Sequence, residues 1–189
     1  MLKHTTIRIF DLILAIFAML VLSPVLILLY VFGLFDTGVP LLRQVRVGIH
    51  RSHFVLLKFR TMRLDTAHVA SHLVSSTAIT PLGFVLRRTK LDELPQLWNV
   101  IRGDMSIVGP RPGLPNQHEL TRARESYGVY TVRPGMTGLA QVNRIDMSVP
   151  DLLAATDAQM IKEMSLANYF KFILMTLLGR GWGDRVIIK

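Results

Sequence analysis

The most constraining feature of this chain is an uncharged apolar segment near its N-terminus, which runs from Leu12 to Phe35. About 20 consecutive apolar residues allow one helix to span a bilayer, so length alone indicates a membrane helix. Ser23-Pro24 interrupts the segment near its middle. Proline has no backbone N–H to donate and its ring clashes with the preceding turn, whereas a neighbouring serine hydroxyl can bond the carbonyl that is left free. We therefore predict a helix that is broken at Ser23-Pro24.

Positive charges lie on both sides of this segment. Positively charged residues normally mark the cytoplasmic side of a membrane protein, so both ends of the segment are expected on that side. A helix that enters the membrane, bends and returns satisfies this pattern; a kinked helix that spans the membrane is the alternative that these residues leave open. Arg8 and Asp11 are one helical turn apart and are placed to pair at the membrane boundary. The flanking cations are Lys3 and Arg8 before the segment, and Arg43, Arg46, Arg51 and Lys58 after it.

Charge and cysteine content narrow the classes of partner and of chemistry. The 189 residues suit a single domain, and they carry a formal net charge of +9 with a pI near 10.5. A protein this basic favours an anionic partner such as nucleic acid, anionic lipid headgroups or phosphorylated small molecules. The chain contains no cysteine, which excludes a disulfide, a thiolate nucleophile and a zinc–thiolate site.

The remainder of the chain has the pattern of a mainly helical α+β domain. Leu41 to Met62 has the composition of two short strands joined by a turn over Gly48 to Ser52, which predicts a small β-hairpin. Asp65 to Ser76 is typical of a helix, and Pro81 suits the first position of the next one. Leu91 to Ile101 keeps its apolar side chains on one side and predicts a short helix.

A second apolar segment lies near the C-terminus, from Leu166 to Leu178, and is too short to span a membrane comfortably. Its pattern predicts an amphipathic helix at the membrane interface, with Lys171 extending toward the headgroups. A helix of the protein core is the alternative. Asp157 and Glu163 flank the preceding helix and are expected to be surface charges.

The segment from Thr89 to Gly113 indicates the chemistry. It places adjacent carboxylates, Asp92 and Glu93, among several cations. Two anions in contact repel by about 4 kcal/mol at an effective dielectric constant of about 20, so a carboxylate that meets a phosphate needs positive charge nearby. A solvated charged turn would explain the acid pair alone, but not the Gly-Pro-Arg-Pro element that follows. Its two prolines fix the backbone around an arginine, whose planar guanidinium suits a phosphate. The cations are Arg87, Arg88, Lys90, Arg102 and Arg111.

The stretch TPLGFVLRRTKLDELPQLWNVIRGDMSIVGPRP, from Thr80 to Pro112, resembles the signature of the bacterial sugar transferases. These are small monotopic phosphoglycosyl transferases that begin glycan assembly on a polyprenol carrier. Leu41 to Met62 and Arg133 to Asn143 resemble the same family in the same order. The resemblance implies a re-entrant membrane helix over residues 1–36, broken at its Ser-Pro pair, and a cytosolic catalytic domain with interfacial helices over residues 37–189. It also implies a bacterial inner (cytoplasmic) membrane protein whose catalytic domain faces the cytoplasm.

The resemblance further implies that a sugar 1-phosphate is transferred from a UDP-sugar to polyprenol (undecaprenyl) phosphate, with release of UMP. Asp92 is then the nucleophile of a covalent aspartyl-phosphosugar intermediate and a ligand of Mg²⁺, while Glu93 serves the metal or the incoming acceptor. An aspartate is ionised near neutral pH and needs no base to activate it. The substrate-binding residues that the family pattern implies are Lys58, Arg60, Arg87, Arg88, Pro110, Arg111 and Pro112, and the residues that hold the membrane topology are Arg8, Asp11, Ser23 and Pro24.

Membrane lipids are further expected partners, because a positive face at Arg43, Arg46, Arg87 and Arg88 suits both anionic lipid and the substrate. The rival functions are a membrane-tethered nucleic-acid-binding protein and a noncatalytic anion-binding scaffold. We expect no nucleic acid, because the cations cluster around acids and Gly-Pro loops and do not form a stripe with stacking aromatics. A homodimer is compatible with the sequence. One departure from the family is Asn143-Arg144-Ile145-Asp146, where members usually carry an Asn-Gly-Arg-Asn type of stretch.

Overall fold

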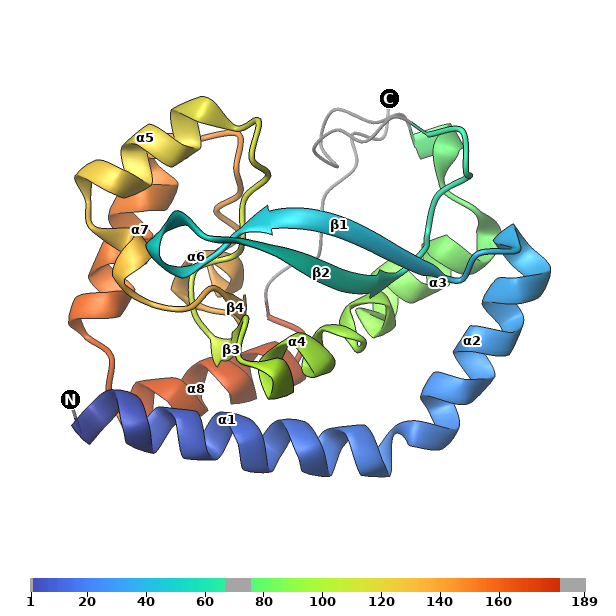
Figure 1. The fold of residues 1–189 in the computed structure, drawn as a ribbon, viewed down its shortest axis with the longest axis horizontal. Helices are drawn as coiled ribbons and strands as arrows, with labels where there is room; N and C mark the ends of the chain where they lie inside the picture. The colour runs from blue at the N-terminus through green and yellow to red at the C-terminus, as the bar shows by residue number, and fades with distance from the viewer. Residues whose placement is uncertain (1, 67–75, 181–189) are drawn as a thin grey trace.

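A computed structural model describes residues 2–66 and 76–180 of the chain (Figure 1). The fold is mainly helical with a small antiparallel sheet, as predicted. Helix α1 (Leu2–Val21) forms one edge of the molecule, and α8 (Leu166–Leu177) lies beside it although the two are far apart in sequence. The predicted helix over residues 65–76 lies almost entirely outside the described residues.

The apolar N-terminal segment is broken where the sequence predicts. Helix α2 (Ser23–Thr37) follows α1 at an angle of 63°, with Pro24 in its first turn. The Ser23 hydroxyl donates to the carbonyl of Leu20 at 2.8 Å, which is the carbonyl that Pro24 cannot reach with an N–H. Within the described residues no single helix is both long and apolar enough to cross a bilayer, whereas α1 and α2 together are.

The predicted hairpin is confirmed. Strands β1 (Leu41–Val47) and β2 (His53–Phe59) pair antiparallel, with Leu41 opposite Phe59 and Val47 opposite His53, and the short turn η1 (Ile49–Arg51) joins them. One face of the hairpin is buried against the rest of the protein, as the alternation of buried and exposed residues along β2 shows.

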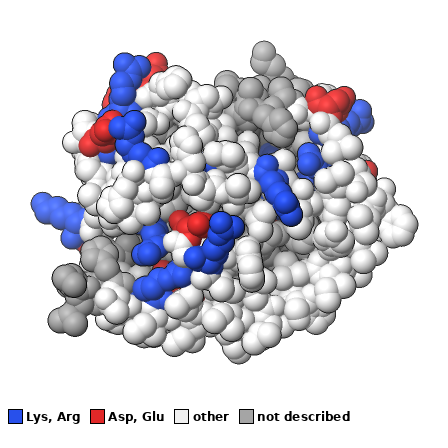
Figure 2. Space-filling model, viewed as in Figure 1, with Lys and Arg blue, Asp and Glu red and all other residues white. Residues whose placement is uncertain are grey.

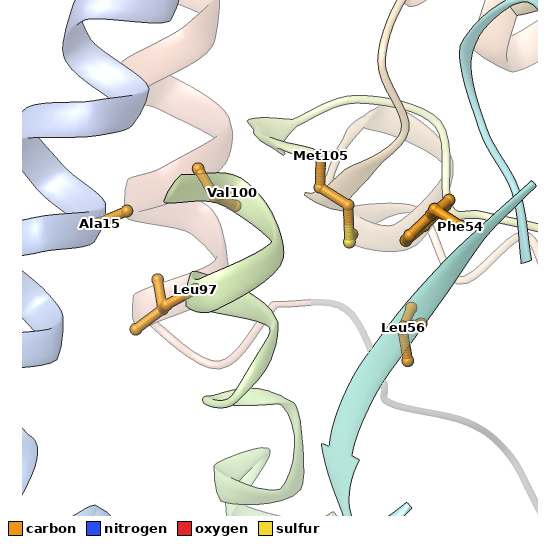
Figure 3. Packing of buried hydrophobic residues seen from close by; sticks show 6 residues of the cluster. All are labelled: Ala15, Phe54, Leu56, Leu97, Val100 and Met105. Carbon is orange, nitrogen blue, oxygen red and sulfur yellow. The ribbon is translucent and has the colours of Figure 1, made fainter. Parts of the chain in front are cut away.

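Helix α4 (Gln96–Arg102) contributes two residues to one of the buried apolar clusters (Figure 3). Leu97 and Val100 of α4 pack against Ala15 of α1 on one side. Phe54 and Leu56 of β2 complete the same cluster from the hairpin, together with Met105. Helix α1 and the hairpin therefore pack on opposite sides of the short helix that follows the acid pair.

The helix predicted over Leu91 to Ile101 is divided in two. Residues Leu91–Glu93 form a single 3₁₀ turn, η4, and α4 begins only at Gln96. Pro95 accounts for the division, because it has no N–H to donate to the carbonyl four residues earlier. Upstream, α3 (Pro81–Thr89) begins as predicted, and the Thr80 side chain caps it by accepting from the N–H of Gly83 at 2.9 Å.

A second sheet, of two three-residue strands, was not anticipated. Strand β3 (Ser106–Val108) pairs parallel with β4 (Gly135–Thr137), in two segments for which the sequence predicts no strand. The other described elements are η3 (Ser76–Ala78), α5 (His118–Ser126), η5 (Val129–Thr131), α6 (Leu139–Val142) and α7 (Pro150–Lys162).

Arg8 and Asp11 connect α1 to the rest of the protein. Arg8 donates to the carbonyls of Ile101 and Met105 at 3.2 and 3.3 Å, at the end of α4 and just beyond it. Oδ1 of Asp11 accepts from the Ser106 hydroxyl at 3.0 Å, the Ile107 N–H at 2.9 Å and the Tyr169 hydroxyl at 2.8 Å. The sequence suggested that the two side chains pair with each other. In the structure they instead hydrogen-bond to α4, to β3 and to α8.

Helix α8 has the features of both alternatives given above, a helix of the core and an amphipathic helix with an exposed apolar side. Tyr169 and Phe172 are buried in the core, whereas Leu174 and Leu177 are exposed. Lys171 also lies on the exposed side. Large apolar side chains are exposed along α1 and α2 as well, and the edge of the molecule over α1 is nearly free of charged side chains in Figure 2. This apolar surface is consistent with helices that contact a membrane.

Candidate active site

The acid pair lies in a short turn whose geometry is set by the residue before it. Lys90 ends α3 in the left-handed conformation, with φ of 60°, and the chain turns there into η4. Asp92 is buried and Glu93 is partly buried. Carboxylates this far from water need cationic or hydrogen-bonding neighbours, and the next elements supply them.

Glu93 forms an ion pair with Arg111. Nη2 of Arg111 lies 2.6 Å from Oε1 of Glu93, and the two side chains are only 23 % and 13 % exposed. An ion pair shielded from water to this degree interacts more strongly than one at the open surface. The contact joins two features that are 18 residues apart in the sequence, the acid pair and the Pro-Arg-Pro element.

The Pro-Arg-Pro loop packs closely on β4. Pro110 and Pro112 are buried, while Arg111 between them extends toward Glu93. A Cβ atom on Gly109 would lie 2.6 Å from the carbonyl oxygen of Arg133 and 2.8 Å from the nitrogen of Gly135. Because Gly109 has no side chain, the loop can lie directly against the backbone of the β4 segment.

Two further predicted cations lie close to this region. Lys58 is buried near the end of β2, the strand that packs on η4. Arg87 on α3 donates from Nε to the hydroxyl of Thr61 at 2.8 Å. Its Nη1 is buried and has no hydrogen-bond partner among the described residues. A buried guanidinium N–H without an acceptor is costly, so Arg87 is suited to receive an anionic oxygen from a ligand.

Two other predicted cations are not joined to the acid pair by any contact within the described chain. Arg60 donates to the carbonyl of Val39 at 2.9 Å, in the connection between α2 and β1. Arg88 is exposed on α3. Their assignment to substrate binding stays a prediction.

Arg46 differs from its predicted place. The sequence predicts that it lies on a positive face for lipid and substrate, but the side chain is buried. It donates to the carbonyl of Pro112 at 3.0 Å and to the Gln44 side chain at 2.6 Å. It therefore supports the Pro-Arg-Pro loop. Arg43, two residues earlier in the strand, is exposed as predicted.

The prediction for Asp157 is wrong. Its side chain is fully buried and is paired with the buried Arg124 of α5, where a surface charge was expected. A local signal was present, because Asp157 follows Leu153 and Ala154 at helical spacing and so falls on the apolar stripe of α7. Glu163, by contrast, is exposed as predicted.

Lys90 belongs to the same electrostatic group. Burial lowers the pKa of the Lys90 ammonium, and Arg111 acts in the same direction while Glu93 opposes it. Lys90, Glu93 and Arg111 are therefore close enough to influence one another. The sequence marks Lys90 as one cation among several but does not single it out.

The donor set of this site fits Mg²⁺ only together with a phosphate ligand. No group of three or more His, Asp or Glu side chains that could hold a metal ion occurs in the described part of the chain. Magnesium usually binds one or two carboxylates and completes its shell with water and phosphate oxygens. Asp92, with Glu93 beside it, supplies carboxylates of that kind, so the residues are compatible with Mg²⁺ that is bound with a substrate.

Several known proteins are similar to this chain. It is 38% identical over 180 residues to the UDP-glucose:undecaprenyl-phosphate glucose-1-phosphate transferase of Caulobacter vibrioides, covering 90% of this chain and 67% of that protein. It is 35% identical to the UDP-galactose-lipid carrier transferase of Erwinia amylovora, with 90% and 39% covered. It is 33% identical to the undecaprenyl-phosphate galactose phosphotransferase of Salmonella typhimurium, with 89% and 39% covered.

The chain thus spans only about two fifths of the length of two of these relatives and two thirds of the third. About nine tenths of this chain are nevertheless covered in each of the three comparisons. The family model described as bacterial sugar transferase matches residues 2–180, nearly everything from α1 to the end of α8. Because this model matches nearly the whole chain, and a relative that is 38% identical is covered over two thirds of its length, the chain belongs to the bacterial sugar transferase family.

Proposed function

We propose that this chain transfers a sugar 1-phosphate from a UDP-sugar to polyprenol phosphate, of the undecaprenyl type, and releases UMP. The observation that carries the proposal is the ion pair between Glu93 and Arg111 at 2.6 Å, which unites the acid pair and the Pro-Arg-Pro loop in one site. The names of the relatives point to the same class of substrates. The sugar itself stays open among UDP-glucose, UDP-galactose and N-acetylated or dideoxy UDP-hexoses.

In the proposed reaction Asp92 is the nucleophile. A carboxylate oxygen of Asp92 attacks the sugar-proximal phosphorus, the bond from that phosphorus to the bridging oxygen breaks, and UMP leaves with the electron pair. An oxygen of polyprenol phosphate then attacks the same phosphorus. The bond to Asp92 breaks, the carboxylate is restored, and the product is a polyprenyl diphosphosugar. Because UMP is released before the acceptor reacts, ping-pong kinetics are expected.

The remaining residues would hold the substrate. Arg111 and Arg87 present guanidinium groups to the diphosphate, and the Arg87 N–H that lacks a partner in the described chain gains one. Bound Mg²⁺, held by Asp92 with Glu93 nearby, would offset the repulsion between carboxylate and diphosphate and stabilise the departing UMP. The exposed apolar surface of α1, α2 and α8 would keep the site at the level of the lipid phosphate, on the cytoplasmic side of the inner membrane.

The decisive experiment measures UMP release from a panel of UDP-sugars, with Mg²⁺ and undecaprenyl phosphate, for the wild type and Asp92→Asn. We expect release with at least one donor in the wild type and none above background in the variant, because an amide is a poor nucleophile toward phosphorus. Asp151→Asn is the matched control, since Asp151 is exposed on α7 and far from the site in sequence. Substantial turnover by Asp92→Asn would refute the assignment of the nucleophile.

A metal requirement is a separate prediction. Chelation with EDTA should abolish UMP release, and added Mg²⁺ should restore it, because the diphosphate has to be neutralised before a carboxylate can approach it. Unchanged release in EDTA would show that the cations of the protein are sufficient.

A further inference from the structure

The Pro-Arg-Pro loop is held by its carbonyl groups. Two of its residues are prolines and have no N–H, so the loop can contribute few backbone donors of its own. Each of its five consecutive carbonyls accepts a hydrogen bond from outside the loop. The donors are Gln141 Nε2 to Gly109 at 3.3 Å, the Gly135 N–H to Pro110 at 2.8 Å, Arg124 Nη1 to Arg111 at 2.7 Å, Arg46 Nη1 to Pro112 at 3.0 Å and the Val47 N–H to Gly113 at 3.0 Å.

The contact to Arg111 is the one that involves a buried charge pair. Arg124 is 2 % exposed and Asp157 is 0 % exposed. Nη2 and Nε of Arg124 both donate to Oδ2 of Asp157, at 2.7 and 3.1 Å, which leaves Nη1 directed at the carbonyl of Arg111. The carboxylate thus fixes the orientation of the guanidinium, and the guanidinium fixes the backbone of Arg111.

Stability alone is a poor explanation for this pair. Removing two charges from water is expensive, and replacing a buried ion pair with apolar residues is often neutral or stabilising. Here the pair is not even fully satisfied, because Oδ1 of Asp157 is buried without a hydrogen-bond partner among the described residues. Burial accordingly raises the pKa of the Asp157 carboxyl, against the opposing effect of Arg124.

We propose that Arg124 and Asp157 are positioning residues for Arg111. They hold its backbone so that the Arg111 side chain meets Glu93 and, on the function proposed above, the diphosphate of the UDP-sugar. Displacing the Arg111 carbonyl would move the guanidinium with it, and a misplacement of about 1 Å can cost about 100-fold in rate.

The test begins with hydrogen exchange, which does not depend on activity. Arg124→Lys keeps the charge but loses the planar fork, so one ammonium has to replace three directed N–H groups. We expect faster exchange of the N–H groups of Val47, Gly109 and Gly135, which bond to or from the loop, in this variant than in the wild type. Arg51→Lys is the control, because Arg51 also pairs with a residue next to Arg124, namely Glu125 of α5. That ion pair is exposed, with 56 % of the Arg51 side chain and 53 % of the Glu125 side chain accessible to solvent. Unchanged protection of the loop in a folded Arg124→Lys protein would overturn the proposal.

The second measurement is a double-mutant cycle with Arg111→Ala, using the donor found in the UDP-sugar panel. Arg124→Lys should lower kcat/KM about 100-fold and raise the KM for the UDP-sugar when Arg111 is present, but should lower kcat/KM less than about threefold in the Arg111→Ala background. Losses that are equal in both backgrounds would show a structural role only. A fall in apparent kcat with KM unchanged would show the same, because loss of folded protein reduces only the number of active sites.

Asp157→Asn serves if Arg124→Lys does not fold. Asparagine keeps the volume and an oxygen acceptor for Arg124, so the variant removes the charge with little change in packing. The same acceleration of loop exchange is expected, to a smaller extent. A loop as protected as in the wild type would overturn the proposal. If the wild type releases no UMP from any donor, the proposed function fails, while hydrogen exchange still decides whether the pair holds the loop.

Discussion

At the scale of single residues, Lys90, which lies just before the acid pair, has two features that destabilise the folded protein. It is a non-glycine residue in the left-handed region, and its ammonium is partly buried. The left-handed conformation costs an ordinary L-residue about 1–2 kcal/mol. A position that ends one helix in this way usually holds glycine. Strain of this kind persists where the surrounding structure requires it, and here it directs the chain into η4 and places Asp92 in the site.

Lys90→Gly should therefore stabilise the fold and weaken substrate binding. We expect the free energy of unfolding to rise by about 1 kcal/mol, because glycine adopts a positive φ without steric cost. The KM for the UDP-sugar should rise, because a cation beside Glu93 and Arg111 is lost. Chemical denaturation in detergent and steady-state kinetics measure the two effects. Thr89→Gly is the control, since Thr89 ends α3 in a right-handed conformation and glycine is unfavourable there.

The stability gained in Lys90→Gly should also depend on pH. Burial lowers the pKa of Lys90 in the folded state, so the unfolded chain binds the proton more tightly. Wild-type stability therefore rises with pH as Lys90 loses its proton in the folded state, and the advantage of the glycine variant shrinks toward alkaline pH. A variant that is less stable than the wild type at neutral pH would contradict this account of Lys90.

At the scale of elements, the site is organised by the parallel pair of β3 and β4. Gly109 and Gly135 are in backbone contact, and a Cβ atom on Gly135 would lie 2.0 Å from the nitrogen of Gly109. The two segments can approach this closely only because neither carries a side chain at the contact. The Pro-Arg-Pro loop leaves β3 directly from this point.

Gly109→Ala should damage both stability and activity. The new methyl group meets backbone atoms that cannot rotate away, so we expect a loss of about 1–3 kcal/mol in the free energy of unfolding. The loop should shift, and kcat/KM per folded protein should fall. Gly38→Ala separates strain from crowding, because Gly38 has φ of +73° but open space around it. That control should lose stability and keep its kcat/KM. Equal kcat/KM values in the two variants would show that the glycine contact does not position the loop.

At this scale the sequence predicts features that depend on neighbouring residues and misses those that depend on distant segments. The break at Ser23-Pro24, the hairpin turn and the Thr80-Pro81 helix start depend on local backbone chemistry, and all three are confirmed. The pairing of β3 with β4 joins residues 106 and 135 through strands of three residues, which carry no periodic pattern.

The candidate site divides in the same way. The acid pair and the Pro-Arg-Pro element stand out as a local motif, and the structure joins them through Glu93 and Arg111. Arg46 and Asp157 were assigned to the surface because they are charged, and the structure shows that each has a buried partner from a distant segment. Arg144 adopts φ of 62°, in the left-handed region that glycine favours, so this position of the loop has the backbone conformation of a glycine turn. Most charged residues are exposed, so the sequence alone predicts exposure for each of them. That prediction is wrong for the few charged residues that are buried because they support a loop.

At the scale of the whole molecule, both ends of the bent helix pair are attached to the same domain. Near the start of α1, Arg8 and Asp11 bind α4, β3 and α8. At the end of α2, Asp36 accepts from the Thr80 hydroxyl at 2.7 Å, where α3 begins. A spanning helix would separate its two ends by the thickness of the bilayer, about 30 Å of hydrocarbon. The attachments therefore favour a helix that bends within the membrane and returns to the side from which it came.

The topology can be tested with single cysteines, because the chain has no cysteine of its own. Replacing Lys3 and Val39 one at a time probes the two ends of the helix pair; Val39 is 47% exposed, whereas Asp36 is better left in place because it binds Thr80. A cysteine at His118, exposed on α5, marks the side of the catalytic domain. A maleimide that cannot cross the membrane should leave all three unlabelled in intact cells and label all three once the inner membrane is opened. Labelling at position 3 in intact cells, with positions 39 and 118 protected, would establish a spanning helix and refute the re-entrant one.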